Sequence, residues 1–138
     1  MVRTNKREVI SEVHSRRTKY ALYEKRRKGE ALGKAPFGYK NIEKSGRKIM
    51  DVEWQEAKVV QKIFEAVASA KNKPSEVYKK YKNRISKSTF YRILKNPFYI
   101  GDLWIPELDR YIQGVHPVFI SERLFSKVSI VLNKWYRR

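Results

Sequence analysis

The chain has 138 residues, with 32 Lys and Arg against 14 Asp and Glu, and a formal net charge of +18. Because such a surplus opposes compact folding by self-repulsion, it indicates a polyanionic partner, and nucleic acid fits better than a membrane surface since the charges are spread along the whole chain. The lack of cysteine excludes disulfides and a Cys-ligated zinc site, and the lack of an apolar run of about 20 residues or of an apolar signal segment favours a cytoplasmic protein.

Residues 6–28 contain neither Gly nor Pro and are rich in helix formers, which predicts one long helix. Its apolar residues give way to Ser, Thr, Arg and Lys between Val13 and Tyr20, so we expect the helix to pack over only part of its length. The helix ends in a basic run, and Gly29 then supplies a residue of the kind that commonly caps a helix.

The segment that follows this helix extends the basic region. Residues 33–40 hold two glycines and a proline within six positions, which excludes a helix and predicts an extended chain that leads into a strand. Extended basic segments often lie in the minor groove of DNA, and the alternative is a run of solvated charges. The first group of candidate DNA-binding residues is Lys25, Arg26, Arg27, Lys28 and Lys34.

A hairpin and an amphipathic helix come next. Residues 48–52 have the composition of a strand, and a turn at 44–46 would pair them with the preceding segment. Residues 54–70 place apolar side chains on one stripe, which predicts a helix packed on a core. The stripe consists of Ala57, Val60, Phe64 and Val67, with Ile63 beside it.

Two shorter helices, at residues 75–82 and 86–95, are joined by a tight turn, an arrangement typical of a helix-turn-helix unit. Ser86 is a suitable N-cap for the second helix. One side of that helix is apolar, with Phe90, Ile93 and Leu94. The other side holds the second group of candidate DNA-binding residues, Lys87, Ser88, Tyr91, Arg92 and Lys95, whose side chains suit base edges and phosphates. A solvated basic face is the alternative.

The remainder predicts a second hairpin and a last helix. Asn96 and Pro97 stop the preceding helix, and Phe98 begins a segment with strand composition. We expect a hairpin of residues 99–104 and 110–113, a loop at 116–120, and a helix after Ser121 that turns Trp135 inward. The expected fold is α+β: a long N-terminal helix, then a small, mostly helical domain with a helix-turn-helix-like unit and short β-hairpins.

Residue types that carry catalysis are scarce. His14 and His116 are the only histidines, and a lone histidine beside a proline in a loop is more often structural than catalytic. The sequence has no Gly-rich phosphate loop and no group of acids with metal-ligand spacing. We therefore expect no catalytic residue, metal or cofactor in this chain.

Four segments carry a resemblance to a known family. They are residues 28–39 (KGEALGKAPFGY), 56–64 (EAKVVQKIF), 86–101 (SKSTFYRILKNPFYIG) and 116–121 (HPVFIS). Together they resemble the recombinase domain of large serine recombinases, which are phage integrases and mobile-element recombinases of the resolvase/invertase superfamily. One such motif would be weak, but the four occur in the family's order and spacing over about residues 19–132.

The resemblance implies sequence-specific binding of double-stranded DNA in site-specific recombination and DNA integration. Residues 1–30 would be the end of the helix that connects a catalytic domain, and residues 31–138 would be the DNA-binding domain. Segment 33–38 would follow the DNA, and helix 86–95 would enter the major groove. The family's catalytic serine domain has no counterpart here, so we expect a monomeric fragment of a bacterial or phage protein that acts at the nucleoid. The full protein would form a dimer or tetramer on DNA through the catalytic domain.

Two other classes of protein fit the composition. A free-standing helix-turn-helix regulator would dimerise through its own surface, although the broken apolar seam of the first helix is poor for a coiled coil. An RNA-binding protein would also suit the charge, but A-form RNA hides its major-groove edges from a helix. The oligomeric state and the choice between DNA and RNA separate these classes from a recombinase domain.

Overall fold

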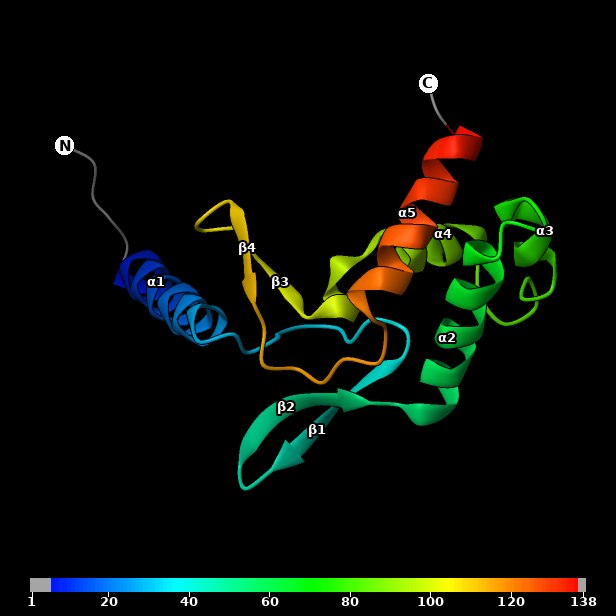
Figure 1. The fold of residues 1–138 in the computed structure, drawn as a ribbon. Coiled ribbons are helices and arrows are strands. Elements are labelled where there is room, and N and C mark those ends of the chain that lie inside the picture. The colour runs from blue at the N-terminus through cyan, green and yellow to red at the C-terminus, as the bar shows by residue number, and fades with distance from the viewer. Residues whose placement is uncertain (1–5, 137–138) are drawn as a thin grey trace.

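The computed structural model describes residues 6–136 of the chain, with side chains from residue 15 onward. Over this range it has an α+β fold with five α-helices and two two-stranded antiparallel hairpins, in the predicted order. The elements are α1 (Lys6–Arg27), β1 (Tyr39–Lys44), β2 (Arg47–Val52), α2 (Trp54–Ala68), α3 (Pro74–Lys79), α4 (Lys87–Lys95), the 3-10 turn η1 (Pro97–Ile100), β3 (Asp102–Ile105), β4 (Arg110–Gln113) and α5 (Glu122–Tyr136). Helix α1 projects from one side, away from α2, α3 and α4 (Figure 1).

The first helix closes with the cap that the sequence predicts at Gly29. The Gly29 N–H donates to the carbonyl of Arg26 (2.8 Å), and the Glu30 N–H donates to the carbonyl of Lys25 (3.1 Å). Gly29 has φ +90°, so this pair of bonds is the Schellman arrangement, which needs a left-handed residue. Helix α1 covers the 22 residues from Lys6 to Arg27.

The hairpin of β1 and β2 confirms the prediction for residues 44–52. Its register runs from Tyr39 opposite Val52 to Lys44 opposite Arg47. The two turn residues, Ser45 and Gly46, both have positive φ (52° and 76°), which matches the right-handed twist of paired strands.

The core lies where α2 packs against α5, with α3, α4 and η1 closing it. Every residue of the predicted stripe on α2 is fully buried. The ring of Phe64 lies 6.1 Å from those of Tyr99 and Phe125. Trp135 was expected to face inward, and this is wrong, because it is 39% exposed at the end of α5. Apolar spacing continues there although α5 has already passed beyond the core.

The strand predicted from Phe98 is also wrong, because Pro97–Ile100 forms the 3-10 turn η1. The side-chain oxygen of Asn96 accepts the Phe98 N–H (3.0 Å) and thereby caps this turn. Gly101, with φ +102°, ends it and lets β3 begin at Asp102. The helix predicted at 75–82 is shorter than expected, because α3 ends at Lys79.

His116 has a structural position, as the sequence indicates. Its ring is 8% exposed and stacks on Phe98, with centroids 3.6 Å apart. Its Nε2 lies 2.6 Å from the carbonyl oxygen of Phe98, and because a carbonyl only accepts, Nε2 carries the proton. Nδ1 is buried without a partner among the described residues. Burial lowers the pKa of His116, although the bond to Phe98 opposes this. The side chain of His14 lies outside the described part.

Replacing Phe64 by Ala should lower the free energy of unfolding by about 3–5 kcal/mol, because the change leaves a cavity in the core. Trp54→Ala is the matched control on the same helix, since its indole is 61% exposed. Urea denaturation measures both values. Equal losses would contradict the buried face assigned to α2.

The pH dependence of stability should carry a contribution from His116. Because its folded pKa lies below the ordinary 6.5, this contribution is complete above 6.5 and is lost as the pH falls below it. His116→Phe keeps the stacking on Phe98 but does not titrate. Urea denaturation from about pH 8 to about pH 5 should therefore show a flatter decline in the variant than in the wild type. Parallel curves would contradict the burial of a neutral imidazole.

Candidate nucleic-acid interface

Helix α4 presents a polar face to solvent and an apolar face to the core. The Ser86 hydroxyl accepts the Thr89 N–H (3.2 Å) and so caps the helix, as predicted. Phe90, Ile93 and Leu94 are buried, which confirms the predicted core side. The side of α4 that lies opposite these residues faces solvent. Its residues Ser88, Arg92 and Lys95 are all exposed.

The turn that leads into α4 is held from the side of α3. The Tyr78 hydroxyl donates to the carbonyl of Ile85 (3.2 Å), and the Tyr78 ring lies edge-on to Phe90, 5.3 Å away. Ile85 itself is 7% exposed. The contacts of Tyr78 with Ile85 and Phe90 thus fix where α4 begins.

The extended segment 33–38 lies alongside α4. The two flank a groove of about 560 Å³, lined by Lys34, Ala35, Pro36, Phe37, Tyr39, Glu56, Thr89, Arg92, Ile93, Asn96 and Tyr99. The Tyr99 hydroxyl donates to the carbonyl of Phe37, and the Gly38 N–H donates to a carboxylate oxygen of Glu56 (2.9 Å). These bonds fix the segment beside α4. The groove is therefore lined by both Lys34 and Arg92, one residue from each predicted group of DNA-binding residues.

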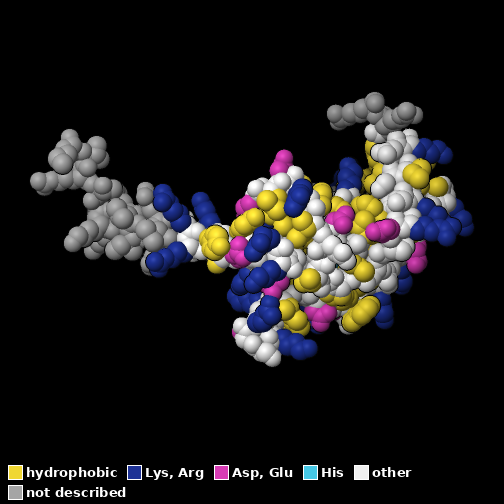
Figure 2. Space-filling model, turned by 60° about the vertical axis from the view of Figure 1, so that its left-hand side comes forward, with side chains coloured by type: hydrophobic (Ala, Val, Ile, Leu, Met, Phe, Trp, Pro, Cys, Tyr) yellow, Lys and Arg dark blue, Asp and Glu magenta, His cyan; other side chains and the backbone are white. Residues whose placement is uncertain are grey.

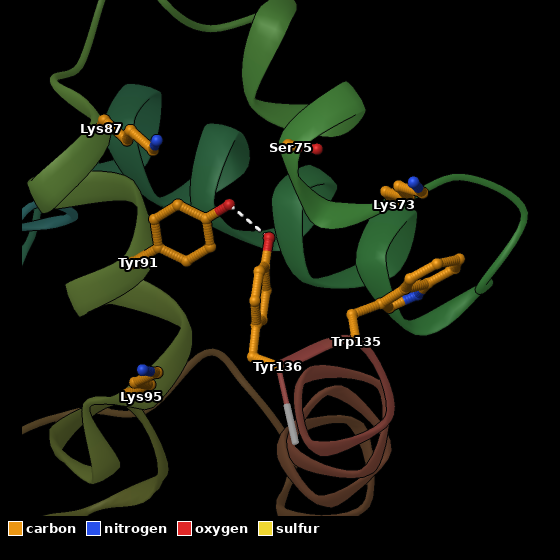
Figure 3. Close-up of a pocket in the computed structure, with 7 residues that line it drawn as sticks. All are labelled: Lys73, Ser75, Lys87, Tyr91, Lys95, Trp135 and Tyr136. Carbon is orange, nitrogen blue, oxygen red and sulfur yellow. Dashed lines mark hydrogen bonds between the residues drawn. The ribbon is translucent and has the colours of Figure 1, made fainter. Parts of the chain in front are cut away.

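On its other flank, α4 borders a second hollow of about 740 Å³, which we name the lysine–aromatic pocket. It is lined by Lys73, Ser75, Lys87, Tyr91, Lys95, Trp135 and Tyr136. Three of the predicted residues of α4 therefore face the start of α3 and the end of α5 (Figure 3).

A hydrogen bond closes one side of this pocket. The hydroxyl oxygens of Tyr91 and Tyr136 are 2.6 Å apart, and the two rings meet edge-on. Burial, and then the bond to Tyr136, raises the pKa of Tyr91 to about 12. Tyr91 is thus neutral at physiological pH, and the bond between the two hydroxyls uses one of the two protons that the pair holds.

The basic run at the end of α1 is partly neutralised by carboxylates. Arg26 pairs with Glu107 in the turn between β3 and β4 (2.9 Å), and Arg27 pairs with Glu24 (2.8 Å). Lys25 and Lys28 are exposed. None of the four lines the groove beside Lys34 or the lysine–aromatic pocket. Lys and Arg side chains are spread over the face seen in Figure 2, with Asp and Glu among them.

The sequence analysis missed several side chains at both hollows. Thr89 and Asn96 line the groove, although the sequence assigns Asn96 only the role of ending a helix. Lys73, Trp135 and Tyr136 line the pocket. The available signal for Lys73 was its place just before Pro74, where a helix begins near the predicted recognition helix.

The described part of the chain shows neither a metal-binding cluster nor a membrane-spanning helix. No three His, Cys, Asp or Glu side chains in it lie together as metal ligands would. Among the helices of residues 6–136, none combines the length and the apolarity that crossing a membrane requires.

The fold recurs in solved structures. A crystal structure of an LSR–DNA complex matches with a TM-score of 0.70 and 20% identity, over 86% of this chain and 38% of that one. A structure from work on the sequence requirements of the Listeria innocua prophage attP site matches with a TM-score of 0.69 and 20% identity, over 86% of this chain and 52% of that one. The present chain thus spans about half or less of the length of these relatives. A comparison with curated protein sequences found no match.

The fold is therefore the α+β fold of a domain that is also found within longer chains. Residues 54–134, more than half of the chain, match the family model named Recombinase. The chain belongs to the Recombinase family, which confirms the resemblance carried by its motifs. The matched range begins at α2 and includes all of α4, whereas α1 and the segment 33–38 precede it.

Replacing Ser86 by Ala should destabilise the domain by about 0.5–2 kcal/mol, because the hydroxyl caps α4. Ser88→Ala is the matched control, since Ser88 is exposed and its hydroxyl lies beside that of Ser86 (3.2 Å) without capping a backbone N–H of α4. Thermal unfolding compares the two variants. A loss in Ser88→Ala as large as that in Ser86→Ala would contradict the cap.

Proposed function

We propose that this chain is the DNA-binding domain of a site-specific serine recombinase and reads double-stranded DNA with α4. The observation that carries the proposal is the exposed polar face of α4, backed by Phe90, Ile93 and Leu94 and flanked by basic residues on both sides. Membership of the Recombinase family and the fold shared with an LSR–DNA complex support it.

Helix α4, with α3 and the turn between them, acts as a helix-turn-helix unit. The first turns of a recognition helix commonly face base edges, so Ser88 and Arg92 are the residues we assign to base contact. Arginine donates two bonds to the acceptor edge of guanine, and lysine or serine can serve bases or phosphates. Lys87, Tyr91 and Lys95 contact the duplex from the side of the same helix.

The segment 33–38 follows the DNA away from α4, with Lys34 over the minor groove. Its hydrogen bonds to Tyr99 and Glu56 support this role, because they hold the segment beside Arg92. In the basic run, Arg26 and Arg27 already hold carboxylates. Lys25 and Lys28 are therefore the stronger phosphate contacts of the four.

The division of the parent protein follows from the same proposal. Residues 1–30 are the end of a connecting helix, and residues 31–138 are the DNA-binding domain. Strand cleavage, which this chain does not perform, belongs to a serine nucleophile in another domain of the parent. The chain is a monomer, and the parent assembles as a dimer or tetramer on DNA in phage or mobile-element integration, at the bacterial nucleoid.

Selection from random duplex DNA at ~150 mM salt, where exposed charges are partly screened, tests this function. We expect one asymmetric sequence to be enriched, as a half-site reader requires. Binding without enrichment would contradict sequence reading by α4. Tighter binding to duplex RNA, or a tight dimer in sedimentation, would favour the RNA-binding or regulator alternative instead.

Arg92→Ala should weaken binding to the selected sequence by about 1–3 kcal/mol and relax the preference at one position, because the variant cannot bond to the base edge. Arg123→Ala removes an arginine that is also exposed but lines neither hollow, and serves as the control. Fluorescence anisotropy on the selected duplex and on single-base variants measures both. Unchanged affinity and preference in Arg92→Ala would exclude Arg92 from the interface.

A further inference from the structure

The lysine–aromatic pocket collects positive charge without any carboxylate. Its seven lining residues include three lysines and neither Asp nor Glu (Figure 3). The lysines come from two separate parts of the chain. Lys73 lies just before α3, and Lys87 and Lys95 are on α4. Like charges that share a hollow repel one another, and an anion in the hollow would offset this repulsion.

Aromatic side chains hold this charge in place. The ammonium of Lys73 lies 5.4 Å from the ring centroid of Trp135, within the range of a cation–π contact. Trp135 and Tyr136 are 39% and 48% exposed, so they line the hollow and are not part of the core. The Tyr91–Tyr136 hydrogen bond ties the end of α5 to α4, which keeps the pocket formed (Figure 3).

The position of the pocket relative to α4 indicates which anion it would meet. An α-helix with its side chains is about 10–12 Å wide, and the major groove is about 12 Å wide, so a helix inserted there has a phosphate backbone along each flank. The outer face of α4 has Arg92, and the lysine–aromatic pocket lies along one flank. A duplex read by that outer face would therefore have one of its strands beside the pocket.

We propose that the lysine–aromatic pocket binds a backbone phosphodiester of the DNA strand that runs along the α5 side of α4. This inference rests on the proposed function. Lys73, Lys87 and Lys95 neutralise the phosphate, and Trp135 positions Lys73. The Tyr91–Tyr136 pair supplies one hydroxyl donor, because the bond between the two hydroxyls uses only one of their two protons. Since phosphate contacts fix orientation and carry no sequence information, the pocket sets how deeply α4 enters the groove.

Lys73→Gln tests the pocket without touching α4. Removing one phosphate contact should lower the steepness of log K against log salt by about 0.9, so we expect that decrease on the selected duplex, with the sequence preference kept. Lys58→Gln is the matched control, because Lys58 is exposed on α2 and lines neither hollow. Trp135→Leu keeps every charge and should weaken binding several-fold.

The outcomes separate the pocket from the proposed function. Wild-type protein that binds no duplex would refute the function itself. Sequence-specific wild-type binding, with equal salt dependence in Lys73→Gln and Lys58→Gln, would overturn the pocket alone. A parallel titration with inorganic phosphate follows the indole resonance of Trp135 by NMR. A shift there, with the salt dependence of Lys73→Gln unchanged, would mean a site for small anions and would also overturn the proposal.

Discussion

The cluster of rings around Tyr39 determines how the parts of this domain meet. Phe98 lies edge-on to Tyr39 at 4.9 Å, Phe119 lies at 5.2 Å, and His116 completes the group at 5.8 Å. These residues come from β1, η1 and the loop before α5, which share no strand pairing. Each hairpin has only two strands, so it is the packing of aromatic rings that connects these elements. In larger α+β domains a continuous sheet makes this connection.

The ring cluster around Tyr39 also fixes the geometry of the candidate nucleic-acid interface. The turn η1 follows α4 after a single residue, Asn96, so burying Phe98 and Tyr99 fixes the C-terminal end of α4. Tyr99 also bonds the chain at Phe37. The same ring therefore anchors the end of the helix and the extended segment beside it. A rigid scaffold of this kind suits the proposed contact with a duplex, which would need no rearrangement of the surface.

The elements that depend on local chemistry were predictable from sequence. The Ser86 cap, the buried side of α4 and the turn at Ser45 and Gly46 each need only neighbouring residues, and all are confirmed. The turn η1 was missed because an Asn96 side-chain bond, and not strand propensity, decides that backbone. Other errors are tertiary. The spacing of Trp135 fits a core face, yet only the packed structure shows that the core ends before it.

The groove beside Lys34 and the lysine–aromatic pocket could not be predicted from the sequence, because they also depend on tertiary packing. Lys34 and Arg92 are far apart in the chain, and Lys73 and Trp135 farther still, so no periodicity relates them. Both predicted groups had the right composition for a polyanion, but composition does not tell which side chains share a hollow. It also does not tell that Arg26 is held by Glu107 across the domain.

The junction at Gly29 has a mechanical consequence. The Val115 N–H donates to the Gly29 carbonyl (2.9 Å), and a side chain at Gly29 would press on Val115 and on the Gln113 carbonyl (3.1 Å each). With Arg26 bonded to Glu107, the end of α1 is held both at the turn between β3 and β4 and just after β4. A twisting force along α1 would therefore pass into the β3–β4 hairpin as well as along the segment 33–38 that lies beside α4. Helix α1 and the β3–β4 hairpin are thus tied together at Gly29, where a larger residue would disturb both.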